Sequence, residues 1–272
     1  RESGLLWRMP GSGAGPEIVP GLPAGIRSYA ISAMGHLAYV HGGALHVMHR
    51  GAAPDRLVAE RGSAPVWSAD GRRLAFASDG VWAHDVDTRE TRRLRPSGTP
   101  LAWSADGAAL VVRGADGAPE LVDGATGDAM RFAVPPVAIA GWLPGRPVAW
   151  LAGAGLQLLT TGDPPMLGPV LAGDVVVAVV GSRPDGRLVA LADRGDGMRA
   201  YEVDLDAAVP AAVPAGPRLA LPEGTGFAWA PDGRTVALAN VGGLSLLDTA
   251  TGAGVRLVRQ PVGEVEWLPI PR

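Results

Sequence analysis

Four of the five histidines fall within one short stretch, a spacing that could support a metal site. They are His36, His41, His46 and His49, and closely spaced imidazole nitrogens are ligands for zinc and copper. The surrounding residues predict a strand over 45–48 between Gly-rich turns, so alternation would point His46 away from its immediate neighbours. We therefore predict no metal site; the alternative is that neighbouring loops gather two or three of these side chains.

Aspartates recur at one position of a repeated turn, where paired carboxylates could perform acid–base chemistry. A glycine follows each of them, and Asp-Gly turns use the carboxylate to bond the backbone while glycine takes positive φ. Sequences typical of a serine-hydrolase elbow, a phosphate-binding loop or a zinc-protease helix do not occur. We interpret four aspartates as turn caps: Asp70, Asp106, Asp185 and Asp232. We predict no catalytic residue and no cofactor.

Arginine supplies all 24 basic residues, and four of them form one run. The formal charge of −3 gives no reason to expect nucleic acid as a partner. Charged side chains on an outermost strand usually protect its edge from pairing, and that is our interpretation of the run. A polyanion-binding patch is the alternative for Arg89, Arg92, Arg93 and Arg95.

An internal repeat dictates which elements carry these residues. Its best copies read Trp-Ser-Ala-Asp-Gly or Trp-Ala-Pro-Asp-Gly, each followed by an apolar run. Taking the tryptophan or its equivalent as a marker gives seven positions, spaced by 36 to 47 residues: 31, 67, 103, 142, 182, 229 and 267. A period near 40 with four short strands per unit is typical of β-propeller blades.

One unit, residues 63–98, can be divided into strands over 64–67, 74–77, 81–86 and 92–95. At the chain ends, Val265–Trp267 resembles a first strand and Leu5–Arg8 a third strand, so we predict that the two ends share one blade whose second strand is not identified. We therefore expect an all-β fold, a single β-propeller domain over residues 1–272 with seven four-stranded blades. Six blades are the alternative.

The Trp-Ser-Ala-Asp-Gly repeat resembles the WD-like repeat of TolB-type propellers over nearly the whole chain. That repeat is found in periplasmic assembly factors, in gating domains of prolyl-oligopeptidase-like enzymes and in bacterial sensor proteins. A narrower similarity, over Ile26–Ser32, is to the propeller of the actinobacterial lipoprotein LpqB. The resemblance implies the fold and leaves the function open.

The recurring tryptophans share one phase of the repeat. We predict that they pack between adjacent blades rather than stack on a sugar. They are Trp67, Trp103, Trp142, Trp229 and Trp267.

The loops between second and third strands are the best candidates for contact with a partner, because insertions in repeat proteins often mark the binding face. The fifth unit is the longest, and part of its extra length lies over 193–197. The predicted contact residues are Asp193, Arg194, Asp196 and Arg199, with Asp79, Asp116 and Asn240 in the corresponding loops. A solvated charged loop is the alternative.

Repetitive scaffold residues without a catalytic constellation predict a non-catalytic binding or sensing domain. We expect its partner to be another protein or a cell-envelope component. The chain starts at Arg1 without Met and has no apolar run of roughly 20 residues, so we expect an extracytoplasmic ectodomain of a longer lipoprotein or single-span protein. The alternatives are a metal-dependent lactonase- or glycosidase-like propeller enzyme and the gating propeller of a larger peptidase.

Overall fold

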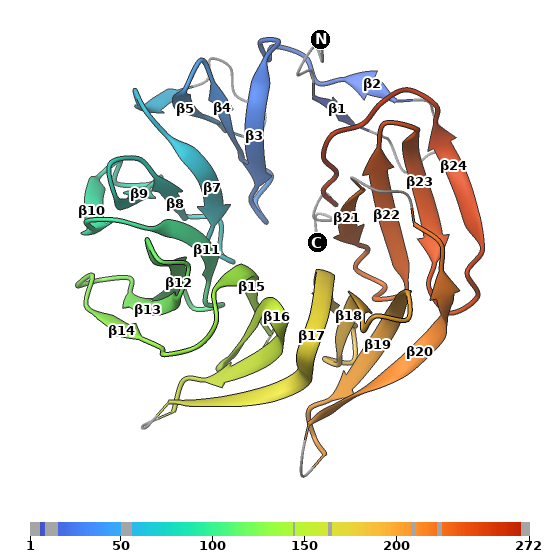
Figure 1. Ribbon diagram of the computed structural model, residues 1–272. Coiled ribbons are helices and arrows are strands. Elements are labelled where there is room, and N and C mark those ends of the chain that lie inside the picture. Colours follow the sequence, from blue (N-terminus) through green and yellow to red (C-terminus); the bar gives the residue numbers. More distant parts are fainter. Residues whose placement is uncertain are drawn as a thin grey trace. The chain divides into compact units, whose positions relative to one another are not determined.

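The computed structural model describes residues 6–8, 16–49, 56–143, 145–162, 165–207, 210–221 and 225–267. Within these residues every regular element is a β-strand, and all strand pairs are antiparallel (Figure 1). None of the described residues forms a helix long and apolar enough to cross a membrane. The described chain divides into two compact units, one up to Phe132 and the other from Ala133 to Trp267.

The first unit holds three four-stranded sheets and one two-stranded sheet. The two-stranded sheet pairs β1 (Trp7–Arg8) with β2 (Glu17–Ile18). The four-stranded sheets are β3 (Ile26–Ile31), β4 (Leu37–His41), β5 (Ala44–Met48) and β6 (Arg56–Ala59); β7 (Ser63–Trp67), β8 (Arg73–Ala77), β9 (Val81–Asp85) and β10 (Thr91–Arg95); and β11 (Thr99–Trp103), β12 (Ala109–Arg113), β13 (Pro119–Asp123) and β14 (Ala129–Arg131). The division of residues 63–98 into four strands is confirmed, with ends shifted by one residue.

The second unit holds one six-stranded and one four-stranded sheet. The six-stranded sheet consists of β15 (Val137–Trp142), β16 (Val148–Thr160), β17 (Met166–Ser182), β18 (Leu188–Asp193), β19 (Met198–Asp204) and β20 (Ala211–Leu219). The four-stranded sheet consists of β21 (Gly226–Trp229), β22 (Thr235–Asn240), β23 (Gly243–Asp248) and β24 (Gly254–Val258).

The six-stranded sheet contains two copies of the sequence repeat, because markers 142 and 182 end β15 and β17. β16 and β17 have 13 and 17 residues, and each continues where a turn would separate two strands of an ordinary blade. Gly155 permits this, since its φ is 102° and a Cβ there would lie 2.3 Å from the Leu171 carbonyl oxygen. The pairing of β16 with β17 shifts register on both sides of Leu156.

The described residues therefore show five blades, and the expected count of seven is not confirmed. Two repeats merge into one sheet because β16 pairs first with β15 and then with β17, while β17 pairs first with β16 and then with β18, and neither strand is interrupted. The predicted first strand at Val265–Trp267 is wrong, since these residues form no strand. Of the predicted strand at Leu5–Arg8, only Trp7 and Arg8 are in a strand, and Leu5 lies outside the described residues.

The marker positions have one structural meaning, because six of the seven are the last residue of a strand. Trp67 packs against a buried cluster drawn from two sheets, including Leu45 of β5 and Phe76 of β8. Trp103 and Trp229 occupy corresponding places in two other clusters. The prediction that these tryptophans pack between neighbouring sheets is confirmed within each unit.

Candidate functional site

Six of the seven predicted contact residues lie in hairpins that join the second and third strands of a blade, and Arg199 lies next to one of them, in β19. We call these hairpins the loop ends. They are residues 78–80 between β8 and β9, 114–118 between β12 and β13, 193–197 between β18 and β19, and 240–242 between β22 and β23. At the opposite ends of the strands lie the turns that join first to second and third to fourth strands, which we call the turn ends.

An Asp or Asn side chain closes each of these four loop ends by accepting a hydrogen bond. Asp193 Oδ1 accepts from the Gly195 and Gly197 amides at 2.7 and 3.0 Å. The corresponding acceptors are Asp79 for the Trp82 indole (2.8 Å), Asp116 for the Ala118 amide (3.2 Å) and Asn240 for the Gly242 amide (2.7 Å). These four side chains therefore hold the hairpins in shape, whatever else they contact.

Arginines on outermost strands pair with three of these loop ends. Arg218 of β20 forms an ion pair of 2.7 Å with Asp196, Arg131 of β14 pairs with Asp116, and Arg93 of β10 lies 3.9 Å from Asp79. Exposed pairs of this kind add little stability, at about 0–1 kcal/mol each. Their consequence for binding is that most of the charge at the loop ends is already neutralised within the chain.

Arg199 lies in β19, next to the loop end at 193–197. Among the described residues it has no hydrogen bond or ion pair, and its Nε is buried without a partner. Its position in β19 lies directly opposite Ala192 of β18 and Arg218 of β20. Directly opposite residues on neighbouring strands share a face, so two arginines lie side by side here.

The turn ends carry the repeated aspartates, and the structure confirms their capping role. Their Oδ1 atoms accept hydrogen bonds from the amides two residues further on, at 2.8–3.1 Å: Asp70 from Arg72, Asp106 from Ala108, Asp185 from Arg187 and Asp232 from Arg234. At Asp106 the Ser104 hydroxyl and the Ala108 amide lower the carboxyl pKa. At Asp70 and Asp232 partial burial alone would raise the pKa, but the hydrogen bonds outweigh it and lower the pKa.

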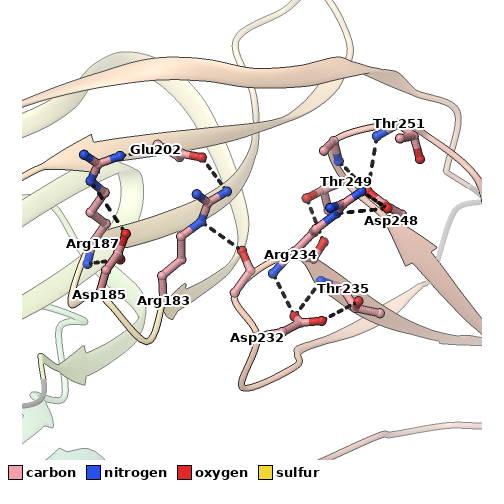
Figure 2. Close-up of polar contacts among 12 residues, drawn as sticks. Arg183, Asp185, Arg187, Glu202, Asp232, Arg234, Thr235, Asp248, Thr249 and Thr251 are labelled. Carbon is pink, nitrogen blue, oxygen red and sulfur yellow. Dashed lines mark hydrogen bonds and ion pairs between the residues drawn. The ribbon is translucent and has the colours of Figure 1, made fainter.

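Figure 2 shows how the turn ends of the second unit are tied together. Arg183 pairs with Glu202 of β19 and donates to the Gly233 carbonyl oxygen at 3.4 Å, which connects two sheets. Arg234 donates to Asp248 at 2.6 and 3.0 Å. These hydrogen bonds are the main cause that lowers the pKa of Asp248 to about 2. Such a carboxylate stays ionised near neutral pH and is poorly suited to donate a proton.

The histidines do not assemble a recognisable metal site. His36 and His49 meet edge to face with ring centroids 4.9 Å apart, whereas His46 stacks on Tyr39 and His41 ends β4. No group of three or more His, Asp or Glu suited to a metal ion is found among the described residues.

The basic run on β10 binds the protein's own backbone and side chains. Arg92 donates to the carbonyl oxygens of Gly124 and Ala125, and Arg95 donates to Glu120 at 3.1 Å. Both contacts reach from the β7–β10 sheet to the β11–β14 sheet. Arg93 lies over the Trp82 ring, 5.9 Å from its centroid. The arginines of β10 therefore connect two blades of the first unit, a role that the sequence analysis did not identify.

Arg218 and Glu202 were likewise not among the residues predicted from the sequence. The sequence pattern that could have indicated Arg218 is an arginine on the outermost strand of a repeat, which also occurs at Arg93 and Arg131. Its partner could not be assigned, because the pairing depends on the register of the outermost strand.

Comparison with known proteins shows the fold and leaves the activity open. No family model and no curated protein sequence matches the chain. The β-propeller domain of Cps50 (Swd1) from Myceliophteria thermophila is similar with a TM-score of 0.65 and 15% identity, over 91% of this chain and 92% of that one. A chain of the mitotic checkpoint complex is similar with a TM-score of 0.65 and 14% identity, over 92% of this chain and 87% of that one.

Two further solved structures are similar to the chain. An oligogalacturonate lyase in complex with manganese has a TM-score of 0.63 and 15% identity, over 86% of this chain and 78% of that one. TolB from Acinetobacter baumannii has a TM-score of 0.50 and 17% identity, over 83% of this chain and 62% of that one. The chain is thus an all-β β-propeller that resembles TolB and WD40-type propellers, and the similarity to LpqB stays a prediction.

Proposed function

We propose that this chain is a non-catalytic β-propeller domain that binds another protein through the loop ends of its second unit. The fold supports the proposal, because it resembles the propellers of protein assemblies such as the mitotic checkpoint complex. The aspartates of the turns are hydrogen-bonded within them, and the pKa values of Asp70, Asp106, Asp232 and Asp248 are lowered. Burial raises the pKa of Glu264, which lies outside these turns. The turn aspartates act as parts of the scaffold.

The observation that carries the proposal is the buried, unpartnered Nε of Arg199. Arg194 of the same loop end also has no ion pair among the described residues, but it is exposed. Arg93, Arg131 and Arg218 each have a carboxylate partner, whereas Arg199 has none among the described residues. A partly buried cation without a partner costs stability, and such costs are typical of binding sites. The neighbouring loop end adds an apolar contact, since Val241 is 82% exposed.

A ring of seven blades, with the location outside the cytoplasm expected from the TolB-like repeat, belongs to the same proposal. In support of the seventh blade, the Trp267 indole donates to the Ala228 carbonyl oxygen at 3.0 Å. Trp67 and Trp229 make the same contact one repeat earlier, with Ala30 and Val179. The location stays a prediction.

Site-specific cross-linking tests the binding surface, because the chain has no cysteine and one can be introduced alone. A benzophenone maleimide attached at Val241→Cys would label partners of the loop ends. The matched control is Ala250→Cys, exposed in the turn that follows the same strand, β23, at its other end. In a cell-envelope extract of the source organism, we expect a discrete adduct at position 241 that unlabelled domain competes away, and none at 250.

Equal labelling at both positions, or none at 241, would contradict the proposal. The enzyme alternative is tested in parallel with oligogalacturonates and lactones in the presence of Mn²⁺. If the purified domain itself converts one of these substrates, the proposed binding function is wrong and a catalytic function takes its place.

A further inference from the structure

The proposed binding function does not specify which chemical group of the partner is bound. The surroundings of Arg199 indicate that group. The Arg199 face of β19 also carries Tyr201, and Tyr201 and Ala192 belong to one buried cluster. The side chain of Arg199 therefore continues an apolar face toward the loop end. Of its three nitrogens only Nε is both buried and without a partner, so the terminal nitrogens reach solvent.

We propose that Arg199 is an anion subsite for a carboxylate of the partner, an inference that rests on the proposed function. A guanidinium presents a planar fork of donors that matches the two oxygens of a carboxylate. The Nε of Arg199 is buried, so the terminal nitrogens are the donors that a carboxylate could reach. Arg218 lies directly opposite and keeps its own partner, Asp196, at 2.7 Å.

The charge of the surroundings favours a monoanion over phosphate. Arg194, Arg199 and Arg218 share this loop end with Asp193 and Asp196, which leaves an excess of one positive charge. A carboxylate neutralises that excess. A phosphate dianion would overcompensate it and would meet two aspartates at close range. An aspartate or glutamate side chain of a protein partner, or its C-terminal carboxylate, has the required chemistry.

The stability of the free domain shows whether Arg199 binds a ligand or stabilises the fold. An unpaired, partly buried charge opposite a like charge destabilises the fold. We expect Arg199→Met to raise Tm by about 2 °C in the absence of partner. Arg218→Met, which breaks an ion pair, serves as the matched control and should not raise Tm. A fall in Tm for Arg199→Met as large as that for Arg218→Met would assign Arg199 to the scaffold and overturn the inference.

The direct test is an NMR titration of the arginine Nε–Hε signals of the full chain. N-acetylglutamate α-amide is the probe, and its neutral glutamine analogue is the matched control ligand. We expect the Arg199 signal, assigned by its loss in Arg199→Gln, to shift saturably with the glutamate probe alone. Arg187→Gln, at the turn ends, should leave that shift unchanged.

An equal shift with the glutamine analogue or with sodium chloride of the same ionic strength would overturn the inference, and so would tighter binding of inorganic phosphate. The two proposals fail separately. If Val241→Cys still cross-links its partner while Arg199 shows no saturable shift, the carboxylate subsite is wrong and the binding surface stands. If no adduct forms at position 241, the binding function is wrong whatever Arg199 binds.

Discussion

At the residue scale, several arginine side chains link neighbouring sheets of this protein. All 24 basic residues are arginine, so every basic side chain of this protein is a planar fork of donors. Several of these side chains reach from one sheet to a turn carbonyl of the next. Arg73 donates to Gly107 at 2.9 Å, Arg92 to Gly124, and Arg183 to Gly233. Arg199 differs because its Nε is buried and has no acceptor among the described residues.

A buried histidine gives the fold a dependence on pH that can be measured. His84 is 5% exposed, and its Nδ1 lies 2.8 Å from the Thr91 hydroxyl. Burial lowers its pKa from the ordinary 6.5; the charges of Arg56 and His49 lower it further, and Asp85 opposes them. The unfolded chain then binds the proton more readily than the folded one. Stability is therefore full above pH 6.5 and falls as the pH drops below it.

We expect the urea midpoint to fall from pH 7 to pH 5, and to fall less in His84→Gln, which cannot be protonated. Urea unfolding followed by tryptophan fluorescence at several pH values measures this slope. His41→Gln, at the partly buried end of β4, is the control and should keep the wild-type slope. An unchanged slope in His84→Gln would show that its titration does not limit stability.

At the element scale, Trp67, Trp103 and Trp229 each end a strand and connect its sheet to the preceding sheet of the same unit. The indole of Trp67 packs into a core built from two sheets and also donates to the Ala30 carbonyl oxygen at 3.0 Å. Trp103 packs in the same way, yet its Nε1 is buried without a partner. The corresponding strands β7 and β11 therefore end in indoles that differ, one with a hydrogen-bond acceptor and one without.

This difference predicts unequal costs for the same substitution. Trp67→Phe removes a hydrogen bond and leaves a carbonyl oxygen unpaired, which should cost about 1–2 kcal/mol. Trp103→Phe removes an unsatisfied donor together with some packing area, so its cost should be smaller. Equilibrium urea unfolding of both variants gives the comparison. Equal losses would mean that packing alone decides the role of these tryptophans.

At the scale of the whole molecule, the number of sequence repeats differs from the number of blades. The sequence contains seven markers, whereas the described residues form five blades and one two-stranded sheet. The last marker, Trp267, belongs to no strand, yet its indole contacts Ala228 as the earlier tryptophans contact their own neighbours. Near it the Val262 amide donates to the Asn240 carbonyl oxygen at 3.0 Å. The end of the second unit is therefore held along the edge of β21 and β22.

We expect Trp267→Ala to cost about 2 kcal/mol, because a half-buried indole and its hydrogen bond are lost together. Thermal and urea unfolding measure the change, and Val255→Ala, at an exposed site on β24, is the control. A cost below that of the control would mean that the terminal segment contributes nothing to the fold, and the seventh blade would lose its support.

The sequence by itself determined the strand content, the repeat, the capping aspartates and the packing of the tryptophans. These features are local, or they recur at fixed spacing, so residue type and period are sufficient to predict them. It also directed attention to the loop of Asp193 to Arg199, because that unit is the longest.

Tertiary structure alone decided which charges are neutralised and which are not. Arg218 finds Asp196, and Arg95 finds Glu120, only through the register and packing of strands that are distant in sequence. It also decided that β16 and β17 merge two repeats into one sheet, because that depends on how far two strands remain paired. Arg199 becomes a candidate site for the same reason: its lack of a partner is a property of all the residues packed around it.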